Sequence, residues 1–175
     1  MRAVSIRTVF ILLDTLRDEF REAVSSYERS AESCAVCTTP GACCLDAHFV
    51  NVRISPLEGE AIRNALNDLP PDKRARVFAR IDDAIDTYKL DEMLDTSAAT
   101  YACPLFEKGI GCLVHSTAKP LPCIAHACYE NESDLPPDDL LDEAELQVDR
   151  LNRRIFGRAR PQQPIPLAVR RGDRT

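Results

Sequence analysis

Eight cysteines fall into two segments of the chain, and this clustering is the strongest constraint on how the chain can fold. The first segment, residues 34–44, reads CAVCTTPGACC and holds four thiols around a proline–glycine turn. The second segment, residues 103–128, holds the other four together with three prolines and two glycines. We therefore expect the second segment to be mostly loop, with at most a short strand at Cys112–His115. A loop of this length in a compact domain needs something to hold it in place.

The role of such thiols depends on the compartment of the protein. The apolar run from Val9 to Leu13 is interrupted by Asp14 and is followed by no small-residue cleavage site, so we do not expect a signal peptide. No stretch approaches the roughly 18 uncharged apolar residues of a membrane span. We therefore expect a cytoplasmic protein with no membrane partner. Clustered cysteines in a cytosolic protein are more often metal ligands or catalytic groups than cross-links.

Charge patterning limits the choice of partners. The net charge is −6, from 22 basic and 28 acidic residues. An acidic body repels a phosphate backbone, so no nucleic-acid partner is expected. The end of the chain differs, since residues 158–175 carry five arginines against one aspartate. We expect this basic, proline-rich tail to be flexible or extended and available to an acidic protein partner.

Helical periodicity dominates the rest of the chain. Apolar residues recur at spacings of three and four, which predicts helices at Ile6 to about Ser33, Pro56 to about Asn67, about Asp72 to Tyr88 and about Pro137 to Phe156. Ser55, Pro56 and Glu58 form the expected start of the second helix. Residues 48–54 alternate as a half-buried strand would. We predict a mainly α fold with at most short strands. A single domain over residues 1–157 would join its two cysteine-rich loops around a metal site.

The order and spacing of all eight cysteines resemble a bacterial family of cysteine-cluster proteins. That family is named for its C-x2-C-x2-CC-type signature and is described as a zinc- or iron-chelating domain. The resemblance covers residues 34–128 and implies that the metal-binding thiols are Cys34, Cys37, Cys43, Cys44, Cys103, Cys112, Cys123 and Cys128. Lys119 and Ile124 stand where relatives have arginines, and His126 stands at an aromatic position. An anion-binding or catalytic role of those arginines is therefore not carried over.

The ligation pattern leaves two cofactors open. Two zinc sites of four thiols would use every cysteine, but only Cys34 and Cys37 form the C-x2-C spacing typical of structural zinc. An iron–sulfur cluster, of the 4Fe–4S type, tolerates irregular spacings, and the Cys103-Pro104 pair fits its habits. Cu(I) is less favoured because the chain has only two methionines.

Some individual ligands also stay open. Adjacent side chains diverge in most backbone conformations, so one of Cys43 and Cys44 can be a packing residue or a reactive thiol. His115 and His126 lie within the second segment, where an imidazole could replace a thiolate, whereas His48 is expected on the surface.

Whether the protein is an enzyme is not decided by its sequence. Cys123, His126 and Asp134 are available as a nucleophile, a base and an orienting group, but nothing in their spacing fixes their geometry. Longer relatives with a similar cluster modify protein lysine side chains as methyl-transferring enzymes. No glycine-rich strand–turn–helix signal for a nucleotide-like cofactor is present. The leading interpretation is a metal-binding protein, and the alternative is a metal-dependent enzyme.

Overall fold

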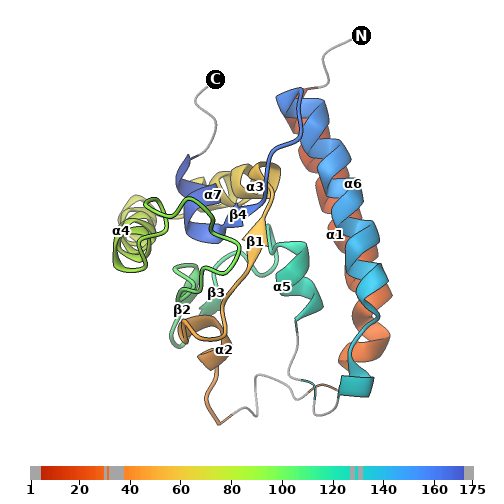
Figure 1. Ribbon diagram of the computed structural model, residues 1–175, viewed down its shortest axis with the longest axis horizontal. Coiled ribbons are helices and arrows are strands. Elements are labelled where there is room, and N and C mark those ends of the chain that lie inside the picture. The colour runs from red at the N-terminus through yellow and green to blue at the C-terminus, as the bar shows by residue number, and fades with distance from the viewer. Residues whose placement is uncertain (1–4, 30, 32–37, 127–128, 130–131, 172–175) are drawn as a thin grey trace. The chain divides into compact units, whose positions relative to one another are not determined.

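The structure is a computed structural model, and it describes residues 5–29, 31, 38–126, 129 and 132–171 (Figure 1). The fold is mainly helical with short antiparallel strands, as predicted. Its elements are α1 (Ile6–Glu28), α2 (Ala42–Leu45), β1 (Arg53–Ile54), α3 (Pro56–Asn67), α4 (Pro71–Thr87), β2 (Phe106–Glu107), β3 (Gly111–Cys112), α5 (Leu121–Ala125), the 3-10 turn η1 (Glu132–Asp134), α6 (Asp138–Phe156), β4 (Gln163–Pro164) and α7 (Ile165–Arg171). No helix in the described part of the chain is long and apolar enough to cross a membrane.

The chain forms two compact units, whereas one domain was expected over residues 1–157. The first unit consists of residues 1–40 and 120–160, and the second of residues 41–119 and 161–175. The chain passes from one unit to the other three times, and a proline lies at each of these boundaries, namely Pro40, Pro120 and Pro161. Proline ends helices and lacks the amide donor that a strand ladder needs, so these positions interrupt regular structure where the chain changes unit.

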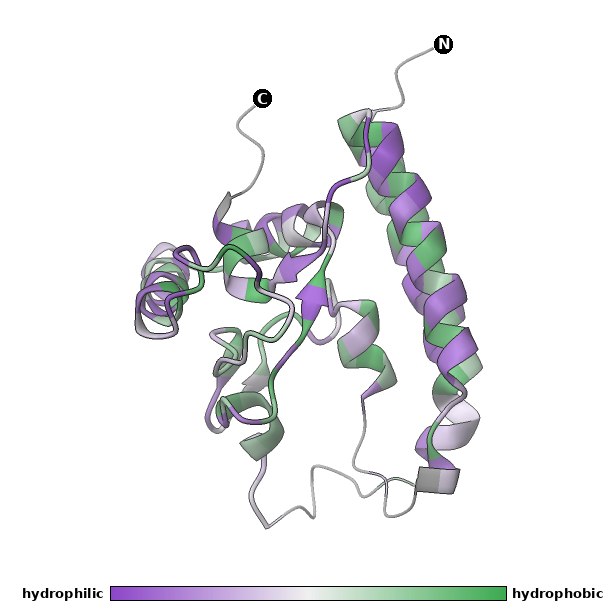
Figure 2. Ribbon diagram, viewed as in Figure 1, coloured by the Kyte–Doolittle hydropathy of each residue, from purple (hydrophilic) through white to green (hydrophobic). Residues whose placement is uncertain are grey.

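In its described residues, the first unit is formed by three α-helices. α1 packs against α6 and α5, and α5 also packs against α6. Alternating apolar and polar faces run along both long helices (Figure 2). The buried apolar residues of this unit are Val9, Leu13, Leu16, Phe20 and Val24 of α1, Leu121 and Ile124 of α5, and Ala144, Val148 and Leu151 of α6. The predicted helical stripes are therefore the ones that form this core, although α1 ends at Glu28 and not near residue 33.

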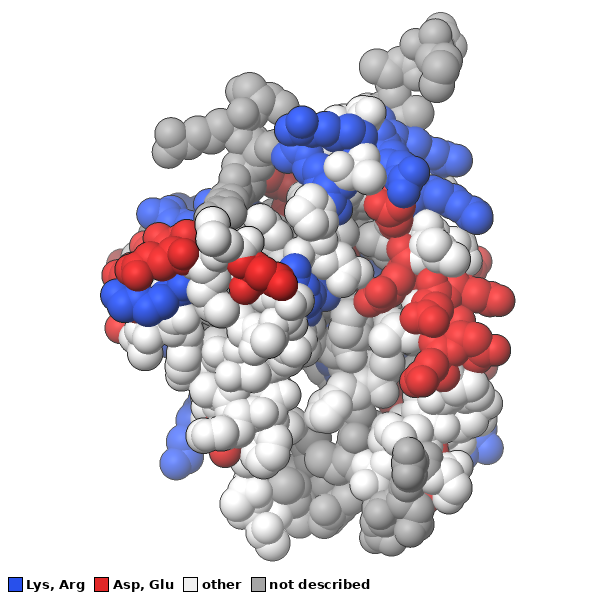
Figure 3. Space-filling model, viewed as in Figure 1, with Lys and Arg blue, Asp and Glu red and all other residues white. Residues whose placement is uncertain are grey.

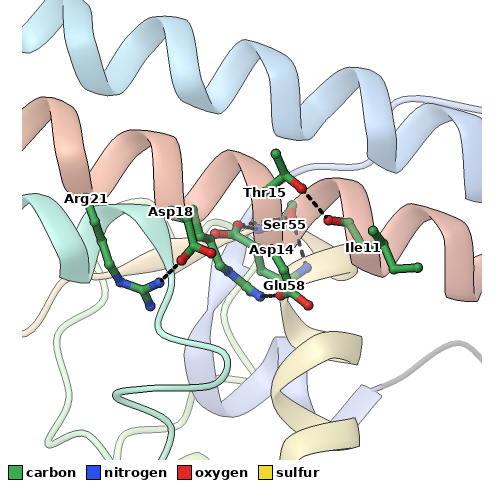
Figure 4. Close-up of polar contacts among 8 residues, drawn as sticks. Ile11, Asp14, Thr15, Asp18, Arg21, Ser55 and Glu58 are labelled. Carbon is green, nitrogen blue, oxygen red and sulfur yellow. Dashed lines mark hydrogen bonds and ion pairs between the residues drawn. The ribbon is translucent and has the colours of Figure 1, made fainter.

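The predicted start of α3 is confirmed in detail. The Glu58 N–H donates to the Ser55 hydroxyl at 3.2 Å, and the Ser55 N–H donates to the Glu58 carboxylate at 2.9 Å (Figure 4). This reciprocal arrangement satisfies two amide groups at the helix start, and Pro56 occupies a position where no amide donor is needed. Helix-local pairs also line α1, where Arg21 donates to Asp18 at 2.7 Å.

The prediction of a flexible or extended tail is wrong for residues 163–170. β4 pairs antiparallel with β1, with Arg53 opposite Pro164, and α7 packs against α3 and α4. Ile165, Leu167 and Val169 of α7 are at most 2% exposed. The prediction rested on the average composition of the tail, which is polar and rich in proline. The short apolar run at residues 165–169 is nevertheless long enough to cover the second unit's core. Arg170, counted as an available charge, forms an ion pair with Asp82 at 2.7 Å.

Tyr101 connects segments of the second unit that are far apart in the sequence. Its side chain is fully buried, and its hydroxyl donates to the Val52 carbonyl and accepts from the Ile165 N–H, the latter at 3.0 Å. The predicted strand at residues 48–54 is reduced to Arg53–Ile54 because only this part meets β4. The other predicted strand, Cys112–His115, is also displaced, since the strand is Gly111–Cys112 and the chain then turns.

Candidate metal centre

Four of the predicted ligands lie together in the second unit. Cys43 and Cys44 come from α2, Cys112 from β3, and Cys103 from the loop before β2. The Cys103 N–H donates to the Cys44 carbonyl at 2.6 Å, so the two cysteine segments are joined through their backbones. All four cysteines are unpaired thiols. The expected meeting of the two segments is therefore present for these four residues.

The turn before α2 is shaped to receive the β2–β3 hairpin. Gly41 has a φ of +80°, in the left-handed region that favours glycine. The ring of Phe106 in β2 lies against this residue, and a Cβ atom at Gly41 would be 1.9 Å from the Phe106 Cζ atom. This close approach brings α2 next to the hairpin that carries Cys112.

The hairpin sets the position of the other two thiols. β2 pairs with β3 so that Phe106 is opposite Cys112, and the Leu113 N–H donates to the Leu105 carbonyl at 3.0 Å. The backbone N–H groups of Leu105 and Phe106 lie close enough to the Cys103 thiol to lower its pKa. The N–H of Val114 acts on the Cys112 thiol in the same way. Amide donors directed at sulfur favour the thiolate, which is the form that binds metal.

Burial has the opposite effect on these thiols. It raises the pKa of Cys103 to about 12, against the lowering effect of its amide donors. Burial also raises the pKa of Cys44 to about 12, and nearby Cys103 and Cys43 raise it further. The pKa of Cys112 is raised, again mainly by burial. Without a cation the thiols of Cys44, Cys103 and Cys112 are therefore held as neutral groups. A bound metal reverses this balance, because a coordinating thiol is deprotonated.

Two basic side chains lie close enough to act on the cluster. The Arg80 guanidinium lowers the pKa of Cys103, and the Lys119 ammonium lowers that of Cys112. Arg80 is positioned by its Nε–H, which donates to the Pro104 carbonyl at 3.0 Å. Its Nη2 atom is buried and has no hydrogen-bond partner among the residues that the structure describes. Sequence reasoning missed Arg80, because its helical context in α4 gives no signal that it faces the cysteines.

The remaining predicted ligands belong to other parts of the chain. Cys34, Cys37 and Cys128 lie outside the described residues, and Cys123 belongs to α5 of the first unit. His48 is exposed, as expected, and bonds to Asp46 at 2.9 Å. His115 is exposed, and His126 lines a cavity of about 200 Å³ in the first unit with Phe20 and Pro122.

The described side chains do not form a closed coordination sphere. Among them, no three histidine, cysteine or acidic residues are grouped closely enough to hold a metal ion as they stand. The chemistry of the donor set nevertheless fits a thiophilic metal, since soft thiolates suit zinc and iron–sulfur clusters. The amide donors to two sulfurs and the unpartnered Nη2 atom of Arg80 also fit a negatively charged centre at this place.

Comparisons with known proteins add no relative. No family model matches the chain, and neither a curated protein nor a solved structure is similar enough to match it.

Proposed function

We propose that this protein binds an iron–sulfur cluster or zinc through its cysteines. The observation that carries the proposal is the backbone contact between Cys44 and Cys103, which joins two cysteine segments that are far apart in the sequence. Cys43 and Cys112 belong to the same group, since each influences the pKa of Cys44. Metal binding would stabilise a region that has little regular structure of its own, because the binding free energy of such sites is folding free energy.

Electrostatics support a cation at this position. Adjacent thiolates repel one another, and burial adds a further cost to a charge on Cys44, Cys103 or Cys112. A metal ion removes both costs, and the amide donors to Cys103 and Cys112 then stabilise the remaining negative charge. The positive charge of Arg80 favours a thiolate at Cys103, whereas a neutral thiol would need no such charge nearby.

Loading requires a rearrangement of side chains. Cys44, Cys103 and Cys112 would turn their sulfur atoms toward one centre, with Cys43 or another cysteine of the chain as the fourth ligand. The resemblance to the cysteine-cluster family extends this proposed ligand set to Cys34, Cys37, Cys123 and Cys128. A reducing compartment such as the cytoplasm would keep these thiols available.

Anaerobic purification followed by elemental analysis and a visible absorption spectrum tests the proposal. Iron with acid-labile sulfide and a brown colour would identify an iron–sulfur cluster, and stoichiometric zinc in a colourless protein would identify zinc. We expect Cys103→Ser to lose metal and thermal stability together, because one ligand is removed. Ala102→Ser introduces the same hydroxyl one position earlier and should keep both. A folded protein that takes up no iron or zinc would refute the proposal.

A metal-dependent enzyme is the alternative proposal, and it differs in the coordination sphere. A structural site is saturated by protein ligands, whereas a catalytic site keeps one position open. An anaerobic titration of the loaded protein with a small thiol or anion, followed in the metal's own spectrum, separates the two. We expect no stoichiometric spectral change. A clear saturable change would show an open position and favour the enzyme.

A further inference from the structure

Helix α6 has one face that its own unit does not use. Its buried residues, Ala144, Val148, Leu151 and Asn152, lie on the side that packs in the first unit, where α6 contacts α1 and α5. The opposite side is exposed. The exposed residues of α6 are Asp138, Asp139, Asp142, Glu143, Leu146, Gln147, Arg150, Arg153 and Arg154.

Charge on this exposed face is separated by sign along the helix. The charged residues of this face are acidic before Leu146 and basic after it, and Figure 3 shows the red side chains gathered along one part of α6 and the blue ones toward its end. Leu146 lies at the boundary, and its side chain is 58% exposed. The face therefore has an acidic half, an apolar centre and a basic half.

The helix dipole explains only part of this pattern. It favours acidic residues in the first turn and basic residues in the last turn, and its effect falls off beyond those turns. Asp138 and Asp139 lie in the first turn, and Arg153 and Arg154 in the last. Asp142 and Arg150 lie further inside the helix, so a different interaction is needed to account for them.

The positions of the charges are symmetric about Leu146. Asp142 and Arg150 are each one helical turn from it, and Asp139 and Arg153 are each about two turns from it. A second identical helix laid antiparallel on this face would place Asp142 opposite Arg150 and Asp139 opposite Arg153, and each pair would occur twice. Leu146 would meet its own copy at the centre. This is the self-complementarity that a two-fold interface requires.

We propose that a second copy of this chain binds to this face, with the two α6 helices antiparallel and Leu146 on the two-fold axis. Within the described residues, the side chains of Asp139, Asp142 and Arg150 have no hydrogen bond or ion pair of their own, so these charges are available to a partner. Arg153 already pairs with Asp149 on the same helix at 2.7 Å. The inner pair, Asp142 with Arg150, therefore contributes most to the interface.

Sedimentation equilibrium on the full chain tests this interface. We expect a dimer at low ionic strength that dissociates as salt is raised from roughly 20 to 500 mM, because exposed ion pairs are screened over this range. Asp142→Arg alone should be monomeric, since it places two arginines opposite each other, and Arg150→Glu alone should be monomeric for the corresponding reason. A mixture of the two variants should form a heterodimer, because both inner pairs again join opposite charges.

Matched controls separate this interface from a general effect of net charge. Asp86→Arg and Arg76→Glu make the same charge changes at exposed positions of α4, and they should dimerise like the unmodified chain. The antiparallel arrangement is supported if mixing Asp142→Arg with Arg150→Glu restores the dimer, and if mixing either of them with a control variant does not. A chain that stays monomeric at low salt would overturn the proposal. A dimer that survives the single reversals would overturn it as well.

Discussion

Gly41 lies where the turn before α2 meets the β2–β3 hairpin. It combines a positive φ with the close approach of the Phe106 ring, so a side chain at this position is opposed both by its backbone and by its neighbour. Gly109 has almost the same φ, +82° against +80°, but a Cβ atom there would meet nothing within 4 Å. The two glycines therefore allow the steric contact to be separated from backbone strain.

Gly41→Ala should lower the free energy of unfolding by about 2–4 kcal/mol, the sum of left-handed strain and displacement of the Phe106 ring. Gly109→Ala should lower it by only about 1 kcal/mol, because it carries the strain alone. Chemical denaturation of the metal-free protein measures both. Equal losses for the two variants would show that the ring contact contributes nothing.

The sequence predicted which cysteines lie near one another better than it predicted the groups that surround their sulfur atoms. Clustering and spacing directed attention to Cys44, Cys103 and Cys112, and the structure does bring these three near one another. The amide donors to sulfur and the approach of Arg80 could not be predicted, because both depend on how the hairpin and α4 pack.

At the scale of whole elements, the contact between α3 and α7 shows how packing overrides local preference. Gly59 lies inside α3, where alanine has the better helix propensity by roughly 1 kcal/mol. A Cβ atom at this position would lie 2.6 Å from the Ala168 carbonyl oxygen of α7. This distance is too short for any real contact, so the two helices can approach as they do only because residue 59 is glycine.

Gly59→Ala should therefore destabilise the protein by about 1–3 kcal/mol, the usual cost of overpacking, in spite of the gain in helix propensity. Asn64→Ala, at an exposed position of the same helix, should be neutral or slightly stabilising. Thermal or chemical unfolding gives the sign directly. A more stable Gly59→Ala variant would mean that α7 does not pack this closely on α3.

At the scale of the whole molecule, residues 163–170 belong to the folded structure. Residues 163–170 close the second unit through β4 and α7, and the Arg63 guanidinium holds α7 by donating from Nε to the Val169 carbonyl at 2.9 Å. A segment with the composition of a tail is thus part of the core.

Leu167→Ala should cost about 2–5 kcal/mol, as expected for truncating a leucine that is 2% exposed. Arg170→Ala removes a half-exposed ion pair with Asp82 and should cost at most about 1 kcal/mol. Denaturant unfolding of both variants compares a core role of α7 with a surface role. Similar small losses for the two would restore the interpretation of residues 163–170 as a loosely attached tail.

The sequence by itself predicted the four longer helices, α1, α3, α4 and α6, and the start of α3, but not α2, α5 or α7. Periodicity, the Ser55 cap and the proline boundaries act over three or four residues, so they can be recognised without knowledge of the fold. Tertiary structure alone decided the two-unit division, the pairing of β1 with β4 and the place of Arg80. These features join segments that are far apart in the chain, as Arg53 and Gln162 are at a separation of 109 residues. The energy of such contacts comes from burial that neither segment can achieve alone, so neither segment's sequence records it.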